Sequence, residues 1–231
     1  TERRRLKEAD FLDIDVYLPP LSAQHRIVDL IDAVDDAIES ADEAHRSQLS
    51  MLNAVIDVPP SADMVALDEV AKIKSGASWS AANGSSTPSD GYRPVLTIVN
   101  TRPDGSVDLT DRTYVTGLSA SVATVTASSL VMIRTNGNRS RIGNVYRAPE
   151  ETIGDAVSAF QFVIELAAPA DRDYLYWVLR APTMQAAISE AASGSTGLGN
   201  VAAGWLKTLS LPWPHAEERE RLTARWAAAC E

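Results

Sequence analysis

The sequence is poor in cysteine and contains no long apolar run. Cys230 is its single cysteine, so no disulfide can form within the chain, which fits a reducing compartment. No apolar run approaches the roughly 18 residues that a membrane-spanning helix needs. The charged start, residues 1–5, is not followed by the apolar segment of a signal peptide. We therefore expect a cytoplasmic protein that does not enter a membrane.

The motifs of common enzyme classes are also missing. His25, His45 and His215 are isolated from any second metal ligand at a recognised spacing. There is no nucleophile elbow, no Walker lysine motif and no Rossmann glycine fingerprint. Neither Pro-Pro pair belongs to the Asn/Asp-Pro-Pro-aromatic tetrapeptide of adenine methyltransferases. The sequence therefore predicts a binding protein with no catalytic residues, no metal and no cofactor.

Acidic residues are abundant but unevenly placed. The formal net charge is −10, and residues 1–58 account for −7 of it, with 6 Lys/Arg against 13 Asp/Glu. In contrast, residues 112–149 contain no acidic residue. The same stretch contains five arginines: Arg112, Arg134, Arg139, Arg141 and Arg147. A basic stretch of this kind is suited to face the phosphates of a nucleic acid.

A short segment near the start of the chain recurs 195 positions later. Ile14-x-Val16-x-Leu18-Pro19 corresponds to Leu209-x-Leu211-x-Trp213-Pro214, and Arg26-Ile27 to Arg221-Leu222. Each copy predicts a short strand, the first over residues 11–16, then a proline stop and an amphipathic helix. The two copies bracket one intervening domain, which predicts one cycle of a two-fold repeated protein.

A long helix is predicted after Pro19-Pro20, with Ser22 as a possible cap. No Gly or Pro occurs from Ala23 to Ile56, which allows a helix about 50 Å long at ~1.5 Å per residue. Apolar residues follow near-heptad spacing, which predicts a partner-helix interface at Ile27, Ile31, Val34, Ile38 and Leu52. The acidic residues beside this stripe form either a solvated face or a docking surface for a basic partner.

The region from residue 59 to 212 predicts an α+β domain. Strands are expected at 92–99, 112–115, 129–134 and 160–166, with Asn-Gly and Asp-Gly turns between several of them. A helix is expected from Asp173 to Ala192, interrupted at Pro182. This order favours a curled, mostly antiparallel sheet with one or two packed helices.

The most pointed candidate site is the turn at residues 134–144. Arginine suits guanine edges, asparagine suits adenine edges, and both suit phosphate. The alternative is a Gly/Asn-rich hairpin whose arginines are simply solvated. The predicted DNA contacts are Arg134, Thr135, Asn136, Asn138, Arg139, Ser140 and Arg141, with Arg112 and, from the polar loop 76–86, Ser78. The loop 193–200 lacks a phosphate-binding lysine, so we expect no nucleotide site there, although the loop remains a candidate for approach to DNA.

These motifs, in this order, resemble the DNA specificity subunits of type I restriction-modification systems. They are Leu18-Pro19-Pro20-Leu21-x-x-Gln24-x-x-Ile27-Val28, Leu67-x-x-Val70-Ala71-x-Ile73-x-Ser75-Gly76, the run from Gly91 to Asn100, Gly105-x-Val107-x-Leu109-x-x-x-x-Tyr114-Val115, Arg134-Thr135-Asn136-Gly137, Tyr174-Leu175-x-Trp177-Val178-Leu179 and Gly194-Ser195-Thr196-Gly197-Leu198-x-Asn200-Val201. In that family, two target-recognition domains are separated by two long antiparallel helices. Each domain reads one half of a bipartite DNA site, and two methyltransferase subunits bind alongside.

The resemblance implies a division of the chain into four parts. Residues 1–18 would end a preceding recognition domain, 19–57 would form the spacer helix, 59–212 the recognition domain, and 213–231 the start of a second spacer helix. The implied partners are double-stranded DNA and an adenine methyltransferase subunit, with a restriction/translocase subunit and a second copy of the chain as further candidates.

The second copy of the spacer motif departs from the family at His215 and Arg219. It also ends at Glu231, so the helix pair is not completed within these residues. Two interpretations follow: a fragment of a longer subunit, or a half-sized subunit that dimerises. From a different class, the alternative function is a non-catalytic protein-interaction scaffold with a coiled-coil helix that does not bind DNA. A divergent hydrolase is a third interpretation, with no nucleophile–base pair to support it.

Overall fold

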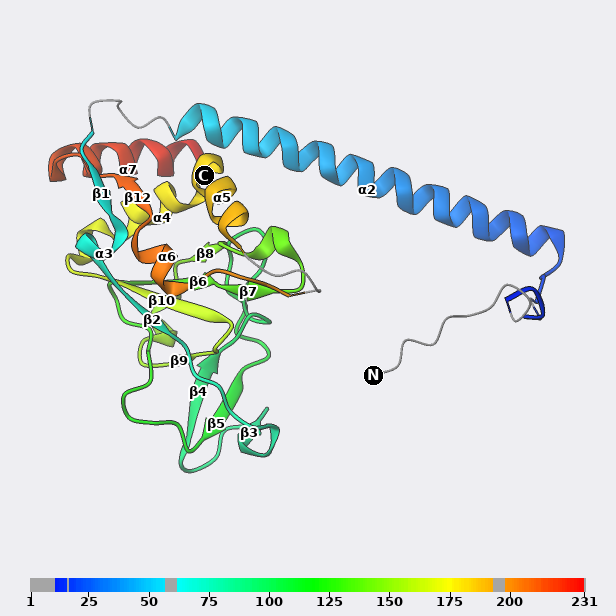
Figure 1. Ribbon diagram of the computed structural model, residues 1–231, viewed down its shortest axis with the longest axis horizontal. Coiled ribbons are helices and arrows are strands. Elements are labelled where there is room, and N and C mark those ends of the chain that lie inside the picture. Colours follow the sequence, from blue (N-terminus) through cyan, green and yellow to red (C-terminus); the bar gives the residue numbers. More distant parts are fainter. Residues whose placement is uncertain (1–10, 16, 57–61, 193–197, 231) are drawn as a thin grey trace. The chain divides into compact units, whose positions relative to one another are not determined.

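The computed structural model describes residues 11–15, 17–56, 62–192 and 198–230 (Figure 1). The chain divides into two compact units, Thr1–Ser50 and Met51–Glu231. Most of the first unit is helix α2 (Leu21–Val55), which confirms the predicted long helix. Ser22, the predicted cap, lies inside its first turn. Among the helices that the structure describes, none has the length and apolarity to cross a membrane.

The strand predicted over residues 11–16 is wrong over its described part. Phe11 and Leu12 are helical, residues 14 and 15 have no regular structure, and Val16 lies outside the described residues. The amide of Ile14 bonds locally to the carbonyl of Phe11 (3.3 Å). A strand needs a neighbouring strand to pair its backbone groups, and the alternating pattern supplies only the side chains for one.

The centre of the second unit is a four-stranded antiparallel sheet in the order β2-β10-β6-β8. The strands are β2 (Ala71–Ser75), β6 (Ser129–Ile133), β8 (Val145–Tyr146) and β10 (Gln161–Leu166). Every residue of β6 is buried, which explains why its sequence is continuously apolar after Ser129. The predicted strands at 129–134 and 160–166 are thereby confirmed within one or two residues.

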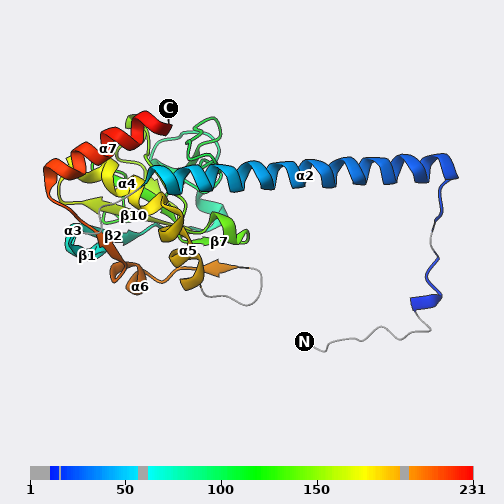
Figure 2. The same ribbon diagram turned by 90° about the horizontal axis from the view of Figure 1, so that it is seen from above.

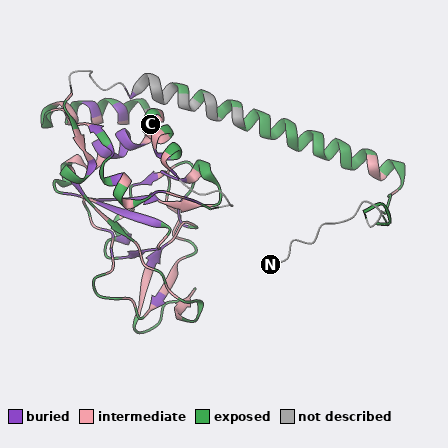
Figure 3. Ribbon diagram, viewed as in Figure 1, coloured by how far each residue is buried: buried purple, intermediate pink, exposed green. Residues whose placement is uncertain are grey.

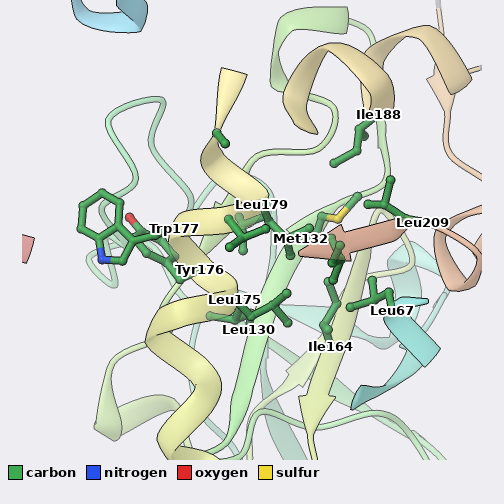
Figure 4. Close-up of a cluster of buried hydrophobic side chains, with 14 of the residues drawn as sticks. Leu67, Leu130, Met132, Ile164, Leu175, Tyr176, Trp177, Leu179, Ile188 and Leu209 are labelled. Carbon is green, nitrogen blue, oxygen red and sulfur yellow. The ribbon is translucent and has the colours of Figure 1, made fainter. Parts of the chain in front are cut away.

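Helices cover one face of this sheet. They are α3 (Leu67–Val70), α4 (Arg172–Arg180), α5 (Pro182–Ala191), α6 (Ala203–Lys207) and α7 (Ala216–Cys230). Both views show α4 and α7 side by side (Figure 1, Figure 2). Leu130, Met132 and Ile164 point from the sheet toward Leu175 and Leu179 of α4 (Figure 4). The predicted break at Pro182 is confirmed, because α5 begins there with proline in its first turn.

The other face of the central sheet packs against a smaller one. Val131 and Val163 point away from the helices and join Leu96 and Val157 in a second core. The small sheet has the order β3-β5-β4-β9, antiparallel except for β4 and β9. Its strands are β3 (Gly84–Ser85), β4 (Tyr92–Leu96), β5 (Thr113–Thr116) and β9 (Ala156–Val157). The α+β class and the mostly antiparallel pairing are confirmed, with the strands divided between separate sheets.

Two short antiparallel pairs complete the domain. β1 (Met64–Ala66) pairs with β12 (Ser210–Pro212), and β7 (Thr135–Asn136) pairs with β11 (Gly199–Asn200). Single 3₁₀ turns are η1 (Ala81–Asn83), η2 (Arg139–Arg141), η3 (Glu150–Thr152) and η4 (Pro169–Asp171). The strand, proline and helix predicted for the second copy of the repeat are therefore present as β12, Pro214 and α7.

Candidate nucleic-acid interface

The turn at residues 134–144 begins where β6 leaves the central sheet. β7 continues it, pairs with β11, and leads through an exposed apex, Gly137–Ser140, into η2. Asn136 Oδ1 accepts the amide of Asn138 (2.8 Å), and Asn138 Oδ1 accepts the amide (3.0 Å) and hydroxyl (2.8 Å) of Ser140. The side-chain oxygens of both asparagines therefore stabilise the turn.

Arg134 ties three chain segments together at the base of this turn. Its Nε donates to Asn200 Oδ1 (3.2 Å), and one terminal nitrogen donates to Ser75 Oγ (3.1 Å). Its guanidinium lies 4.6 Å from the ring centroid of Phe162. Thr135 Oγ1 donates to the same Asn200 oxygen (2.7 Å). Arg134 and Thr135 thus hold the ends of β2, β6 and β11 in one place.

Arg139 is the basic side chain at the exposed apex. One terminal nitrogen donates to the carbonyl of Ala192, at the end of α5 (2.5 Å). This single anchor aligns the guanidinium, and Arg139 forms no ion pair among the described residues. Its charge is therefore available to an anionic partner.

Arg141 points back into the domain. Its terminal nitrogen donates to the carbonyl and hydroxyl of Thr101 and to the carbonyl of Ile98. The loop after β4 that Arg141 contacts is also held by the buried Asn100, whose side-chain nitrogen donates to the carbonyls of Asp108 (3.0 Å) and Asp111 (2.9 Å). Arg141 therefore fastens the turn at residues 134–144, which we call the basic turn, to the loop after β4. The sequence did not reveal this role.

We expect Arg141→Ala to lower the free energy of unfolding by about 2 kcal/mol, because hydrogen bonds to a charged group are lost and the carbonyl of the buried Thr101 loses its donor. Chemical denaturation measures this loss. Arg221→Ala is the matched control, since it removes the same charge and breaks only an exposed pair with Glu218 on α7. Unchanged stability of Arg141→Ala, together with weakened DNA binding, would instead make Arg141 a DNA contact.

Residues 112–149 contain no acidic residue, but acidic residues from other parts of the chain lie beside them in the structure. Arg112 forms an ion pair with Asp155, and Arg147 lies 3.5 Å from Asp173; both acids come from outside residues 112–149. Burial raises the pKa of Asp155, while the charge of Arg112 acts in the opposite direction. Among the described residues, Arg134, Arg139 and Arg141 form no ion pair. The positive charge is therefore concentrated on the turn rather than spread over the whole stretch.

Ser78 is exposed and follows Ala77, which is connected to the turn at residues 134–144 through two backbone hydrogen bonds. The amide of Ala159 donates to the carbonyl of Ala77 (2.7 Å), and the amide of Arg134 donates to the carbonyl of Phe160 (2.9 Å). Phe160 is 47% exposed, and neither it nor Ser75 was among the DNA contacts predicted from the sequence. Arg112 lies elsewhere, in an open hollow beside the small sheet that Trp79 and Ser85 also line. The residue after Ser78, Trp79, lines this hollow with Arg112, while the residue before it, Ala77, bonds to the segment that leads to Arg134.

The other residues and segments predicted from the sequence lie in other parts of the structure or outside the described residues. The loop 193–197 falls outside the described residues, while Gly199 packs closely against Ile142. On α2, the predicted interface residues Ile27, Ile31, Val34 and Ile38 are 49–55% exposed. Leu52 lies within α2, and its side chain is outside what the structure describes. Within the described ranges, no three His, Cys, Asp or Glu residues gather in a way that would hold a metal ion.

Comparison with known proteins gives matches by structure alone. No protein-family model matches the chain, and no curated protein matches its sequence. The HsdS subunit from Thermoanaerobacter tengcongensis superposes with a TM-score of 0.56 at 17% identity, over 92% of this chain and 51% of that one. A chain from a study of complex assembly and conformational transition of the type I R-M system gives 0.59 at 18% identity, over 91% and 52%.

A third match is weaker. The type I restriction-modification S subunit from M. genitalium gives a TM-score of 0.48 at 15% identity, over 75% of this chain and 40% of that one. The chain thus spans about half the length of the structures it matches. It has the fold of one half of an S subunit of type I restriction-modification systems.

Proposed function

We propose that this chain is a non-catalytic DNA-recognition subunit that reads one half of a bipartite site and positions adenine methyltransferase subunits. The observation that carries the proposal is the exposed apex Gly137–Ser140, where Arg139 carries an unpaired positive charge on a turn fixed to the central sheet. The shared fold with S subunits supports the same function.

The turn has the properties of a recognition element. Its apex is polar and exposed, and its base is fixed by the Arg134 contacts to Ser75 and Asn200. A contact group that is held in place before binding loses little conformational entropy when it meets its target. Arg139 would donate to guanine O6 and N7 or to phosphate, and Asn138 and Ser140 would add polar contacts. Arg134 and Thr135 would support these residues from behind.

In the same proposal, α2 is the spacer that sets the distance between half-sites. Its exposed apolar residues would pair with another helix, and its acidic residues would face a basic surface of a methyltransferase subunit. A restriction/translocase subunit and a second copy of the chain would be further members of the assembly.

We expect Arg139→Ala to weaken binding to duplex DNA about tenfold, which corresponds to ~1.4 kcal/mol and lies within the range for one arginine contact. Fluorescence anisotropy with a labelled duplex library, at low and moderate salt, measures the change. Arg221→Ala, which removes an exposed arginine of α7, is the charge-matched control and should bind like the parent chain. Equal affinities for parent and Arg139→Ala at low salt would remove Arg139 from the interface.

A protein-interaction scaffold is the second candidate, favoured by the exposed apolar side chains of α2. Figure 3 shows most of the described part of α2 in the colour of exposed residues. Salt separates the two functions. A DNA-binding chain loses affinity steeply as salt rises, because the phosphates it neutralises release counterions. A scaffold would show no measurable DNA affinity even at low salt, and it would retain a protein partner held by apolar contacts when salt is raised.

A further inference from the structure

Exposed apolar side chains gather around the basic turn. Among the large apolar residues that the structure describes in the second unit, five are exposed, and three of them adjoin this turn: Val99, Phe160 and Leu198, at 60%, 47% and 54%. The other two, Met64 and Ile153, belong to β1 and to the residue after η3. Single exposed apolar residues are ordinary on a protein surface, whereas a group of them around one polar turn indicates a surface that a partner covers.

Each of the three side chains belongs to a segment that bonds to the basic turn. Leu198 directly precedes β11, which pairs with β7. Val99 follows Ile98, whose carbonyl accepts a bond from Arg141 (3.4 Å). Phe160 accepts two amides of the basic turn through its own carbonyl. Its link to the turn is therefore the most direct of the three.

Phe160 occupies a tight turn between β9 and β10. The amide of Gln161 donates to the carbonyl of Ser158 (2.9 Å), so Phe160 stands at the third position of this turn. The side chains of the same two residues are buried, and the Ser158 hydroxyl donates to Gln161 Oε1 (2.8 Å). Glycine and short polar residues are the usual occupants of such turns. The local backbone therefore does not require a phenylalanine, and its exposed ring is available to a partner.

The backbone of Phe160 and the base of the basic turn form one unit. The amides of Arg134 and Thr135 donate to the carbonyl of Phe160 (2.9 and 3.3 Å). The next aromatic residue along the chain, Phe162, is 0% exposed, and its ring centroid lies 4.6 Å from the guanidinium of Arg134. One ring is thus part of the core and the other faces solvent. A side chain on a backbone that is fixed before binding loses little conformational entropy when it meets its target.

The surroundings of Phe160 suit the major groove of duplex DNA. Its turn bonds to residues 75–78 and 133–136, which contain no acidic residue and one arginine. The groups that base edges present in the major groove are polar, with one exception, the C5 methyl group of thymine. A phenylalanine ring beside a basic turn in that groove therefore has the thymine methyl group as its apolar partner.

We propose that Phe160 contacts the methyl group of a thymine in the recognised half-site and makes the chain prefer thymine at that position. This inference rests on the proposed DNA-recognition function and adds to it one residue and one base. The contact joins two apolar groups, so it contributes to sequence preference without neutralising a phosphate or releasing counterions.

Replacing thymine by uracil tests this contact, because it removes the methyl group and leaves the hydrogen-bonding edges of the base unchanged. Duplexes that the intact parent chain selects from a random library are amplified with dTTP or with dUTP, and both pools are titrated by fluorescence anisotropy. We expect the parent to bind the thymine pool about fourfold more tightly, the change that burial of one methyl group gives. Phe160→Ala should bind the thymine pool more weakly by at least this factor and should bind both pools alike.

Three further variants separate the contact from other effects. Phe160→Leu retains an apolar side chain and should keep a preference for thymine that is smaller than the parent's. Phe160→Asn suits the turn and should lose the preference as completely as Phe160→Ala, so the result does not depend on the folding of one variant. Ile153→Ala is the matched control, because Ile153 is 52% exposed and follows Glu150 and Glu151, which repel phosphate. It should bind both pools like the parent.

Stability and salt dependence provide two more measurements on Phe160→Ala. Its melting temperature should stay within about 3 °C of the parent's, because the side chain is half-exposed. The slope of log affinity against log salt concentration should equal the parent's, since an apolar contact releases no counterion.

Three results would overturn the assignment. One is equal affinity of the parent for the two pools. Another is a preference for thymine that Phe160→Ala and Phe160→Asn retain, which would place the methyl group against a different residue. The third is a loss of affinity by the same factor on both pools, which would show a contact that does not involve the methyl group. A parent chain that binds neither pool at low salt would instead remove the proposed function together with this inference.

Discussion

Trp226→Ala is expected to lower the free energy of unfolding by about 3–5 kcal/mol, the range for truncating a large buried aromatic side chain. Trp226 is among the largest fully buried side chains of the chain, and its indole stacks on Tyr174. The substitution would leave a cavity between α4 and α7 that the rigid central sheet cannot close. In a thermal melt, the corresponding shift is roughly 6–20 °C for a unit of this size.

Ile31→Ala is the matched control, because Ile31 occupies the same position in the first copy of the repeat. Its side chain is half-exposed in the free chain, so its truncation should change the stability by less than ~0.5 kcal/mol. Equal losses from the two substitutions would mean that the copies are buried alike in solution. A negligible loss from Trp226→Ala would contradict the packing of α7 on α4.

Gly76→Ala is expected to cost about 3 kcal/mol and to weaken DNA binding at the same time. Gly76 lies where β2 leaves the central sheet, and its amide donates to the carbonyl of Gln161 (3.1 Å). A Cβ at this position would lie 2.1 Å from the carbonyl oxygen of Ser158 and 2.5 Å from that of Val157. These are backbone atoms between the two sheets, so the neighbouring chain would have to shift.

The loss of DNA affinity follows from the neighbours of Gly76. Ser75 accepts a bond from Arg134 at the base of the basic turn, and the shift would disturb that anchor. Denaturant titration and DNA titration of the same preparation measure the two effects. Gly204→Ala is the control, since a Cβ there meets nothing within 4 Å and alanine favours the helix α6. A Gly76→Ala chain with parental stability would contradict the close approach of the two sheets.

Regular elements with strong local signals could be predicted from the sequence. The absence of Gly and Pro from Ala23 to Ile56 predicted α2, and the apolar runs predicted β6 and β10. Residues 11–16 show the limit of such patterns. Their alternation is the same as that of the segment ending in β12, yet β12 is a strand because β1 pairs with it. Alternation describes the side chains of a strand, whereas its partner comes from the tertiary structure.

The candidate site was only partly predictable. A polar, arginine-rich turn was recognisable, but the function of each residue depends on neighbours distant in sequence. Arg141 reaches Thr101, 40 residues away, and Arg112 meets Asp155, 43 residues away. Charge counted along the chain cannot include such partners. Of the predicted residues, Asn138, Arg139 and Ser140 lie at an exposed apex, whereas Arg134 and Arg141 form hydrogen bonds to other segments beneath it.

Mapping methylated adenines tests the proposed function most directly. The chain is co-expressed with its adenine methyltransferase subunit in a host without other methylation, and the host DNA is sequenced by a single-molecule method that detects the modified base. Our account predicts methylation at one split motif with a fixed gap, and loss or relaxation of one half of that motif in the Arg139→Ala chain. Methylation that is unchanged when this chain is omitted, or absent although both proteins co-purify, would contradict it.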